Sequence, residues 1–265
     1  MFEIIIVLAV LASIISGIWD LFTTEVPDQI PYAMVGSGIL YWAYNWLSTG
    51  NIQLFSISLF TGTLLLGLGL LMYKKGQWGA ADAWVLAGIA YMIPVYNGSV
   101  FILPYLMNFV FVALGYVILY ALLVGFQNRA IVANGLKKDL NKNSKILTLP
   151  PVAIFIALVI ASAYNSSALN YWFAAPFSLV ILVLWRYAKV IENTVFTKKI
   201  STKKLRTGDV LEKNIWIGLT SKEIKRLKTS KKYVTVKDGI RFVPVFTITL
   251  LLTLLGFNLF LMIFG

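Results

Sequence analysis

The stretch EIIIVLAVLASIISGIWD, residues 3–20, decides the fold class, because it is an almost uninterrupted apolar run that ends in a carboxylate. A run of about 20 apolar residues spans the hydrocarbon core of a bilayer as one helix. No basic segment precedes this run and no Ala-x-Ala cleavage site follows it, so it lacks the pattern of a secretory signal peptide. We therefore expect a membrane helix that the chain retains.

Similar runs recur along the 265 residues, and the composition agrees with them. Hydrophobic residues make up 59% of the chain, charged residues make up 13%, and the mean hydropathy is +0.80. A soluble domain is nearer half apolar and about a quarter charged. We predict an all-α polytopic membrane protein with about eight transmembrane helices and a small cytoplasmic α+β domain before the last helix. The expected spans are 3–19, 29–48, 54–73, 82–97, 101–126, 146–165, 170–188 and 243–263.

The distribution of cations predicts the orientation of these spans. All 23 lysines and arginines fall within 74–75, 129–145 and 186–241, which are on one side of the membrane if the eight spans alternate. By the positive-inside rule that side is cytoplasmic, which puts both termini outside. The formal charge of +12 is then a topology signal that also favours membrane lipids as partners. We expect no nucleic-acid partner, because no base-reading motif accompanies the basic loops.

The chain is expected to have a membrane domain over 1–192, a small cytoplasmic domain over 193–242 and a final transmembrane helix over 243–265. Within the small domain, Thr207–Asp209 is typical of a turn. Thr220 and Glu223 have the spacing of a capping box at a helix start, and Tyr233–Val236 alternates as a short strand does.

Two residue types that commonly perform chemistry are missing, since the chain contains no cysteine and no histidine. Disulfides, thiol catalysis, Ser-His hydrolysis and histidine-based metal sites are thereby excluded. We predict no metal and no cofactor. Any catalysis is expected to depend on carboxylates, lysines, tyrosines or hydroxyls.

Two of the eleven acidic residues, Asp20 and Asp82, stand between apolar and aromatic neighbours at the cytoplasmic boundary of expected spans. A carboxylate at such a place is costly and usually functional. Two of them at the same depth could share a proton, so that one accepts a proton from an attacking water while the other protonates the departing amine. Each could also simply cap a helix end, and Asp82 suits the first turn of a helix.

Two motifs resemble those of the type IV prepilin peptidase family. DLFTTEVPD, residues 20–28, resembles its first signature, in which an Asp that ends the first helix is followed by an aliphatic-Pro-Asn/Asp turn. The second signature is Gly-x-Gly-Asp, and here the sequence is Gly79-Ala80-Ala81-Asp82. The segments 208–209, 218–220 and 239–246 resemble the cytoplasmic extension of the archaeal preflagellin and prepilin peptidases.

The resemblance implies an aspartic endopeptidase with Asp20 and Asp82 as its catalytic pair, supported by the loop of Gly79, Ala80 and Ala81. It implies as substrate a pilin-like precursor with an N-terminal hydrophobic helix, from which a short basic leader is removed on the cytoplasmic side. Bacterial members often add N-methylation and a cysteine-bound zinc; without cysteine, we expect peptidase activity alone. Ala81 departs from the signature glycine, which could provide close backbone approach or a positive φ.

Glu25 and Asp28 are candidate subsites for the basic residues of a leader, although solvated turn residues fit the same pattern.

Three other functions remain open for the whole chain. A secondary transporter could couple protons through Asp20 and Asp82, but it would favour mid-bilayer carboxylates and repeated halves. Signal-peptide-peptidase-like proteases share Gly-x-Gly-Asp but have Tyr before the first Asp, where this chain has Trp19. A non-catalytic pilus-assembly protein is the third. The oligomeric state is not predicted.

Overall fold

The structure is a computed structural model that describes residues 2–164, 171–205, 209–211, 218–237 and 239–264. The chain divides into two compact units. The first contains 1–116, 201–234 and 238–265, and the second contains 117–200 and 235–237.

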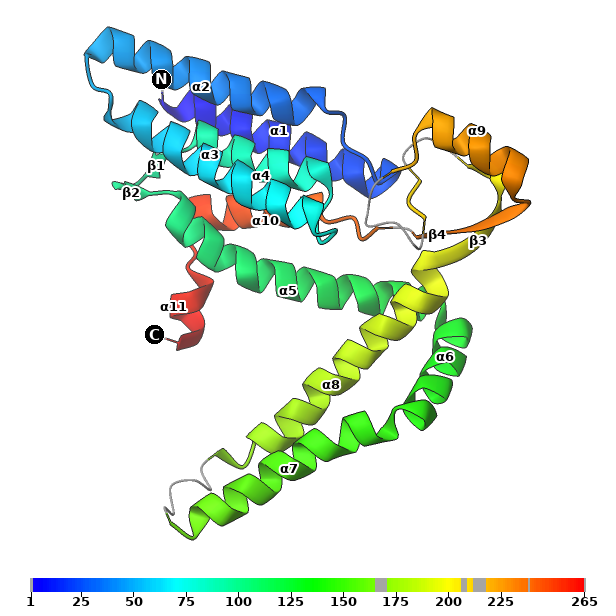
Figure 1. Cartoon of the computed structure of the whole chain (residues 1–265). Helices are drawn as coiled ribbons and strands as arrows, with labels where there is room; N and C mark the ends of the chain where they lie inside the picture. Colours follow the sequence, from blue (N-terminus) through cyan, green and yellow to red (C-terminus); the bar gives the residue numbers. More distant parts are fainter. Residues whose placement is uncertain (1, 165–170, 206–208, 212–217, 238, 265) are drawn as a thin grey trace. The chain divides into compact units, whose positions relative to one another are not determined.

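The first unit is a bundle of apolar helices. Figure 1 shows α1, α2, α3, α4 and α10 beside one another, and α4 packs against each of the other four. The helices of this bundle are α1 (Phe2–Thr23), α2 (Gln29–Thr49), α3 (Gln53–Lys74), α4 (Ala80–Met92) and α10 (Val243–Leu254). The unit also holds the first part of α5 (Ile102–Gln127).

Helix α4 is the centre of this bundle, because nearly all its residues from Asp82 to Met92 are buried. A helix that is apolar on all sides is stable only where neighbours cover it completely. Its last carbonyl groups lack partners within the helix, and the flanking helices supply donors. Trp42 of α2 donates from Nε1 to the Met92 carbonyl at 3.1 Å, and the Ser58 hydroxyl of α3 donates to the Tyr91 carbonyl at 2.6 Å.

The expected span 82–97 is wrong at its C-terminal end. Helix α4 ends at Met92, and a hairpin follows, formed by β1 (Val95–Tyr96) and antiparallel β2 (Ser99–Val100). Asn97 and Gly98 form its turn with φ of 49° and 77°. A two-residue turn with both φ values positive favours Asn-Gly. This turn ends the apolar run earlier than hydropathy alone indicates.

The expected last span, 243–263, is also interrupted. Helix α10 ends at Leu254, Gly256 has a φ of 81°, and a short helix, α11 (Leu259–Phe264), follows. Asn108 of α5 stabilises the interruption, because its side-chain amide donates to the Phe257 carbonyl at 2.8 Å and its carbonyl accepts from the Leu259 N–H at 2.9 Å. Asn108 thus links α5 to the segment between α10 and α11.

The protein is a helical membrane protein, but the count of eight spans is not confirmed. Within the described ranges, five helices are long and apolar enough to cross a membrane: Glu3–Thr23, Gln53–Lys74, Ile102–Gln127, Ser144–Ser162 and Ala174–Phe196. Helices α4 and α10 are apolar but shorter.

The segment 193–242, which the sequence predicts as a small domain, is divided between the two units, and its part in the first unit contains α9 (Ser221–Ser230) and a 3-10 turn, Thr202–Lys204. The capping box is confirmed: the Thr220 N–H donates to Glu223 Oε2 at 2.8 Å and the Glu223 N–H donates to Thr220 Oγ1 at 3.4 Å. The bonds from Thr220 lower the pKa of Glu223. The predicted strand is also present, as β4 (Tyr233–Lys237). Of the expected turn, Thr207 and Gly208 lie outside the described residues.

The second unit contains the remaining part of α5 and the helices α6 (Arg129–Lys142), α7 (Ser144–Ser162) and α8 (Ala174–Ile191), with α7 packed along α8. A π-helical turn, Glu192–Phe196, and β3 (Thr197–Ser201) follow, and β3 pairs with β4. Helix α6 occupies a segment that hydropathy classes as a polar loop.

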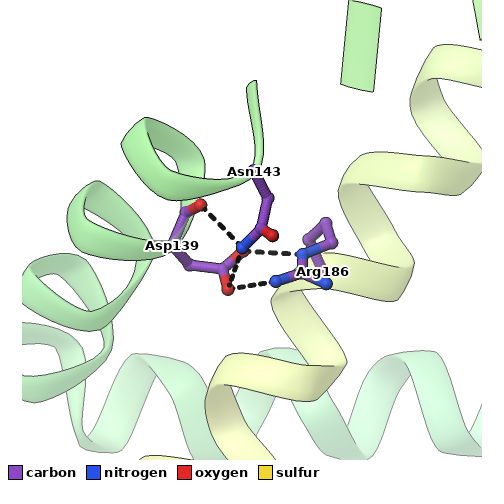
Figure 2. Close-up of polar contacts among 3 residues, drawn as sticks. All are labelled: Asp139, Asn143 and Arg186. Atoms are coloured by element: carbon purple, nitrogen blue, oxygen red, sulfur yellow. Dashed lines mark hydrogen bonds and ion pairs between the residues drawn. The ribbon is translucent and has the colours of Figure 1, made fainter. Parts of the chain in front are cut away.

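An ion pair joins α6 to α8 in this unit, as Figure 2 shows. Arg186 of α8 makes two hydrogen bonds to the Asp139 carboxylate, one of them from Nε at 2.7 Å. Asn143 donates to Asp139 Oδ1 at 3.1 Å. A two-point arginine–carboxylate contact fixes orientation as well as distance, so this pair holds the polar helix α6 against α8.

Candidate active site

Asp20 lies near the C-terminal end of α1 and is buried, with 6% of its surface exposed. Its Oδ2 accepts a hydrogen bond from the Val243 N–H at 3.0 Å. Val243 is the first residue of α10, whose first N–H groups have no partner inside the helix and carry partial positive charge. Asp20 therefore caps a helix that begins 223 residues later in the chain.

Asp82 lies in the first turn of α4 and is 8% exposed. Its Oδ2 accepts the N–H of Gly79 at 2.8 Å. Gly79 is the residue before the helix and has extended backbone angles, with φ −74° and ψ 158°. The side chain thus turns back over its own helix start, as the acidic residue of a capping box does.

The two carboxylates come from helices that pack against each other. Helix α1 packs against α4, and Asp20 and Asp82 interact electrostatically. In each residue, Oδ2 is held by a backbone N–H, whereas Oδ1 accepts no hydrogen bond from the residues that the structure describes. Two buried acids are therefore each anchored through one oxygen and have the other oxygen available.

An aromatic cluster connects the two anchoring peptide groups. Trp78 directly precedes Gly79, and Phe242 directly precedes Val243. The Trp78 ring lies 6.3 Å from that of Phe242 and 5.9 Å from that of Phe246, between centroids. Rings at these distances attract one another beyond their shared burial. The cluster therefore ties the backbone that holds Asp82 to the backbone that holds Asp20.

The supporting loop is mainly helical. Ala80 and Ala81 are the first two residues of α4, and neither has a positive φ. A glycine at the position of Ala81 is thus not required by the backbone angles of this structure. Alanine is accommodated there because it partly packs against the core.

The two candidate subsite acids lie in the turn that follows the Asp20 helix. Glu25 and Asp28 are both exposed in the turn between α1 and α2, and Asp28 is the residue before α2 without a side-chain cap bond. No described residue makes a hydrogen bond or ion pair to either carboxylate. Both are therefore exposed turn residues, and their role as subsites stays a prediction.

The region that contains Asp20 and Asp82 resembles a known protein family. Residues 6–125 match the model of the type IV leader peptidase family, and this stretch includes both aspartates. Over these residues the chain is similar to the type IV leader peptidase family. Comparisons with curated proteins and with solved structures gave no match. The family indicates a protease that processes pilin-like substrates.

The two sequence motifs point to both acids but not to the groups around them. Val243, which donates to Asp20, and Arg241 lie beyond the matched residues 6–125, in the segment 239–246 that resembles the cytoplasmic extension and leads into the expected last span. Every residue except proline has a backbone N–H, so the sequence does not distinguish Val243 as the donor to Asp20. Arg241 could have been suspected, because it is the last cation before an apolar helix. Among the described residues there is no group of three acidic side chains that could hold a metal.

Gly79→Ala is expected to lower the rate of leader cleavage about tenfold. A Cβ at Gly79 would lie 3.2 Å from Asp82 Oδ2, so the carboxylate must move by a few tenths of an ångström, and small displacements of reacting groups are costly. The measurement is kcat/KM for a precursor in detergent. Ala81→Gly is the matched control; it adds no contact, so its rate should stay within about threefold of wild type. Equal rates for both variants would contradict this account of Gly79.

Proposed function

We propose that the protein is a membrane aspartic endopeptidase that removes short basic leader peptides from type IV pilin-like or archaellin precursors at the cytoplasmic face. The observation that supports this most is the pair of buried carboxylates from different helices, each fixed by one backbone N–H and each with one oxygen available. Ion coupling or an assembly role has no comparable support in the family match.

In the proposed reaction, Asp20 and Asp82 together hold one proton, and a water molecule binds between them. The ionised carboxylate takes a proton from the water while the oxygen of the water bonds to the scissile carbonyl carbon. The protonated carboxyl then gives its proton to the peptide nitrogen as the carbon–nitrogen bond breaks. The products are a new carboxyl terminus and a free amine, and the pair again holds one proton.

The proposed setting is a multi-pass protein of the plasma membrane with both termini outside. It is supported by the restriction of all 23 cations to three segments on one expected side. Asp20 and Asp82, at helix ends near that side, would meet a precursor where its leader joins its hydrophobic helix. Glu25 and Asp28 are exposed close to Asp20 in sequence and would attract the basic residues of a leader. We also propose that the protein belongs to the archaeal branch of this family.

Cleavage of a precursor by the purified full chain tests the proposal. The probe is a synthetic peptide with a Lys- and Arg-rich leader ahead of an apolar helix, and mass spectrometry locates the cut. We expect one cut between the leader and the helix, at a rate that excess EDTA leaves unchanged. A peptide with the same leader moved behind the helix is the control and should stay intact. No cut in the first peptide, or loss of the cut in EDTA, would overturn the proposal.

A further inference from the structure

Arg241 lies beside the point where α10 meets Asp20. It stands two residues before Val243, whose N–H binds Asp20 Oδ2, and its own carbonyl accepts a hydrogen bond from the Tyr116 hydroxyl of α5. The Arg241 side chain and Asp20 attract each other electrostatically. Two elements of the first unit, α10 and α5, therefore hold the backbone that places this cation near Asp20.

The Arg241 side chain is also incompletely bonded. Its Nε atom is buried and has no hydrogen-bond partner in the described part of the chain. Leaving a buried N–H unsatisfied costs stability, so such a group in a folded protein requires an explanation. Packing does not supply one, because an aliphatic side chain would fill the place without this cost. The positive charge of Arg241 is the remaining property that the site can use.

Both acids are buried and each accepts one backbone N–H, but their charged neighbours differ. Each carboxylate accepts one backbone N–H at the start of a helix, from Val243 for Asp20 and from Gly79 for Asp82. The charged neighbour of Asp82 is Asp20, an acid. Asp20 in addition has a cation. An opposite charge favours an ionised carboxylate and a like charge opposes it.

We propose that Arg241 is a positioning residue that holds the negative charge of the pair on Asp20 and leaves the shared proton on Asp82. This inference rests on the proposed peptidase function and assigns its roles. Asp20 accepts the proton of the attacking water, and Asp82 gives its proton to the departing amine nitrogen. The active site then includes a residue that lies beyond the stretch matched by the family, 6–125.

A charge series at Arg241 tests the inference through cleavage kinetics. Arg241→Gln is expected to lower kcat about ten- to a hundredfold and to change KM less than threefold, because the charge acts on the acids and not on the bound precursor. Arg241→Lys keeps the charge and should restore kcat to within about fivefold of wild type. Arg226→Gln removes an exposed cation of α9 and serves as the control. Equal losses in the Lys and Gln variants, or no loss in the Gln variant, would overturn the inference.

Carbodiimide labelling gives a second readout that needs no substrate. A hydrophobic carbodiimide adds to a protonated carboxyl and, after rearrangement, leaves an N-acylurea with the full mass of the reagent. Mass spectrometry of the wild type should find the adduct on Asp82 and little on Asp20. Arg241→Gln should raise labelling of Asp20 severalfold, and Arg241→Lys should not. Predominant labelling of Asp20 in the wild type would refute the charge assignment.

The two readouts separate this inference from the proposed function. If the wild type cuts no precursor, the function fails, yet the labelling pattern still decides where the proton lies. If the wild type cuts the precursor and Arg241→Gln cuts it equally well, only the inference about Arg241 fails.

Discussion

Asp20→Asn and Asp82→Asn are each expected to lower the rate of leader cleavage by about 10²–10⁴-fold, the usual contribution of a positioned acid or base. An amide neither accepts the proton of a water at neutral pH nor supplies one to an amine. The fold should persist, because the Asn carbonyl oxygen still accepts the N–H of Val243 or Gly79 that the carboxylate binds. The measurement is single-turnover cleavage in detergent together with the thermal unfolding midpoint.

Two exposed acids provide matched controls for these variants. Glu25→Gln and Asp28→Asn remove the same charge close to Asp20 in sequence, but their side chains are in solvent. Because they are proposed to attract the leader, their loss should raise KM and should leave kcat within about threefold of wild type. Retained cleavage by either Asp20→Asn or Asp82→Asn would exclude the shared-proton mechanism.

A variant that combines Asp20→Asn with Asp82→Asn tests whether the two acids act together. Because the two acids act in one reaction, removing both should cost about as much as removing one. A double variant that is slower by the product of the two single losses would show that the acids act independently. That outcome would favour two separate structural roles over a catalytic pair.

The sequence predicted both acids because a carboxylate inside an apolar boundary is rare and conspicuous. It could not predict what holds them. The donor to Asp20 is a backbone N–H of Val243, and neither backbone polarity nor a contact over 223 residues appears in local composition. The donor to Asp82 is local, and the placement of Asp82 in a first turn did indicate it.

The helix boundaries show where hydropathy alone is insufficient. Apolar residues continue from α4 into the hairpin, so averaging over a window hid the Asn97-Gly98 turn although its signal was present. For helix α6, hydropathy indicates a loop because its residues are polar. The helix is stabilised by the Arg186–Asp139 pair, which no local pattern reveals. A local turn decided the first segment, and a contact with a neighbouring helix decided the second.

Gly38→Ala is expected to destabilise the bundle by about 1–3 kcal/mol or more, as overpacking of a filled core does. A Cβ at Gly38 would lie 2.7 Å from the backbone carbon and oxygen of Tyr91 and 2.9 Å from the Met92 nitrogen. Backbone atoms cannot rotate away, so α4 must move from α2. The same movement would stretch the bond from Trp42 to the Met92 carbonyl. Thermal or denaturant unfolding in detergent measures the loss.

Gly36 supplies the control, because it lies on the same helix two residues away and a Cβ there meets nothing within 4 Å. Gly36→Ala should be neutral or stabilise by about 0.5–1 kcal/mol, the usual gain from replacing a helical glycine. Since α4 also positions Asp82, only Gly38→Ala should slow cleavage among molecules that remain folded. Equal stability of the two variants would mean that α2 and α4 are not packed as closely as Gly38 and Tyr91 indicate, and the placement of Asp82 by this bundle would then need another explanation.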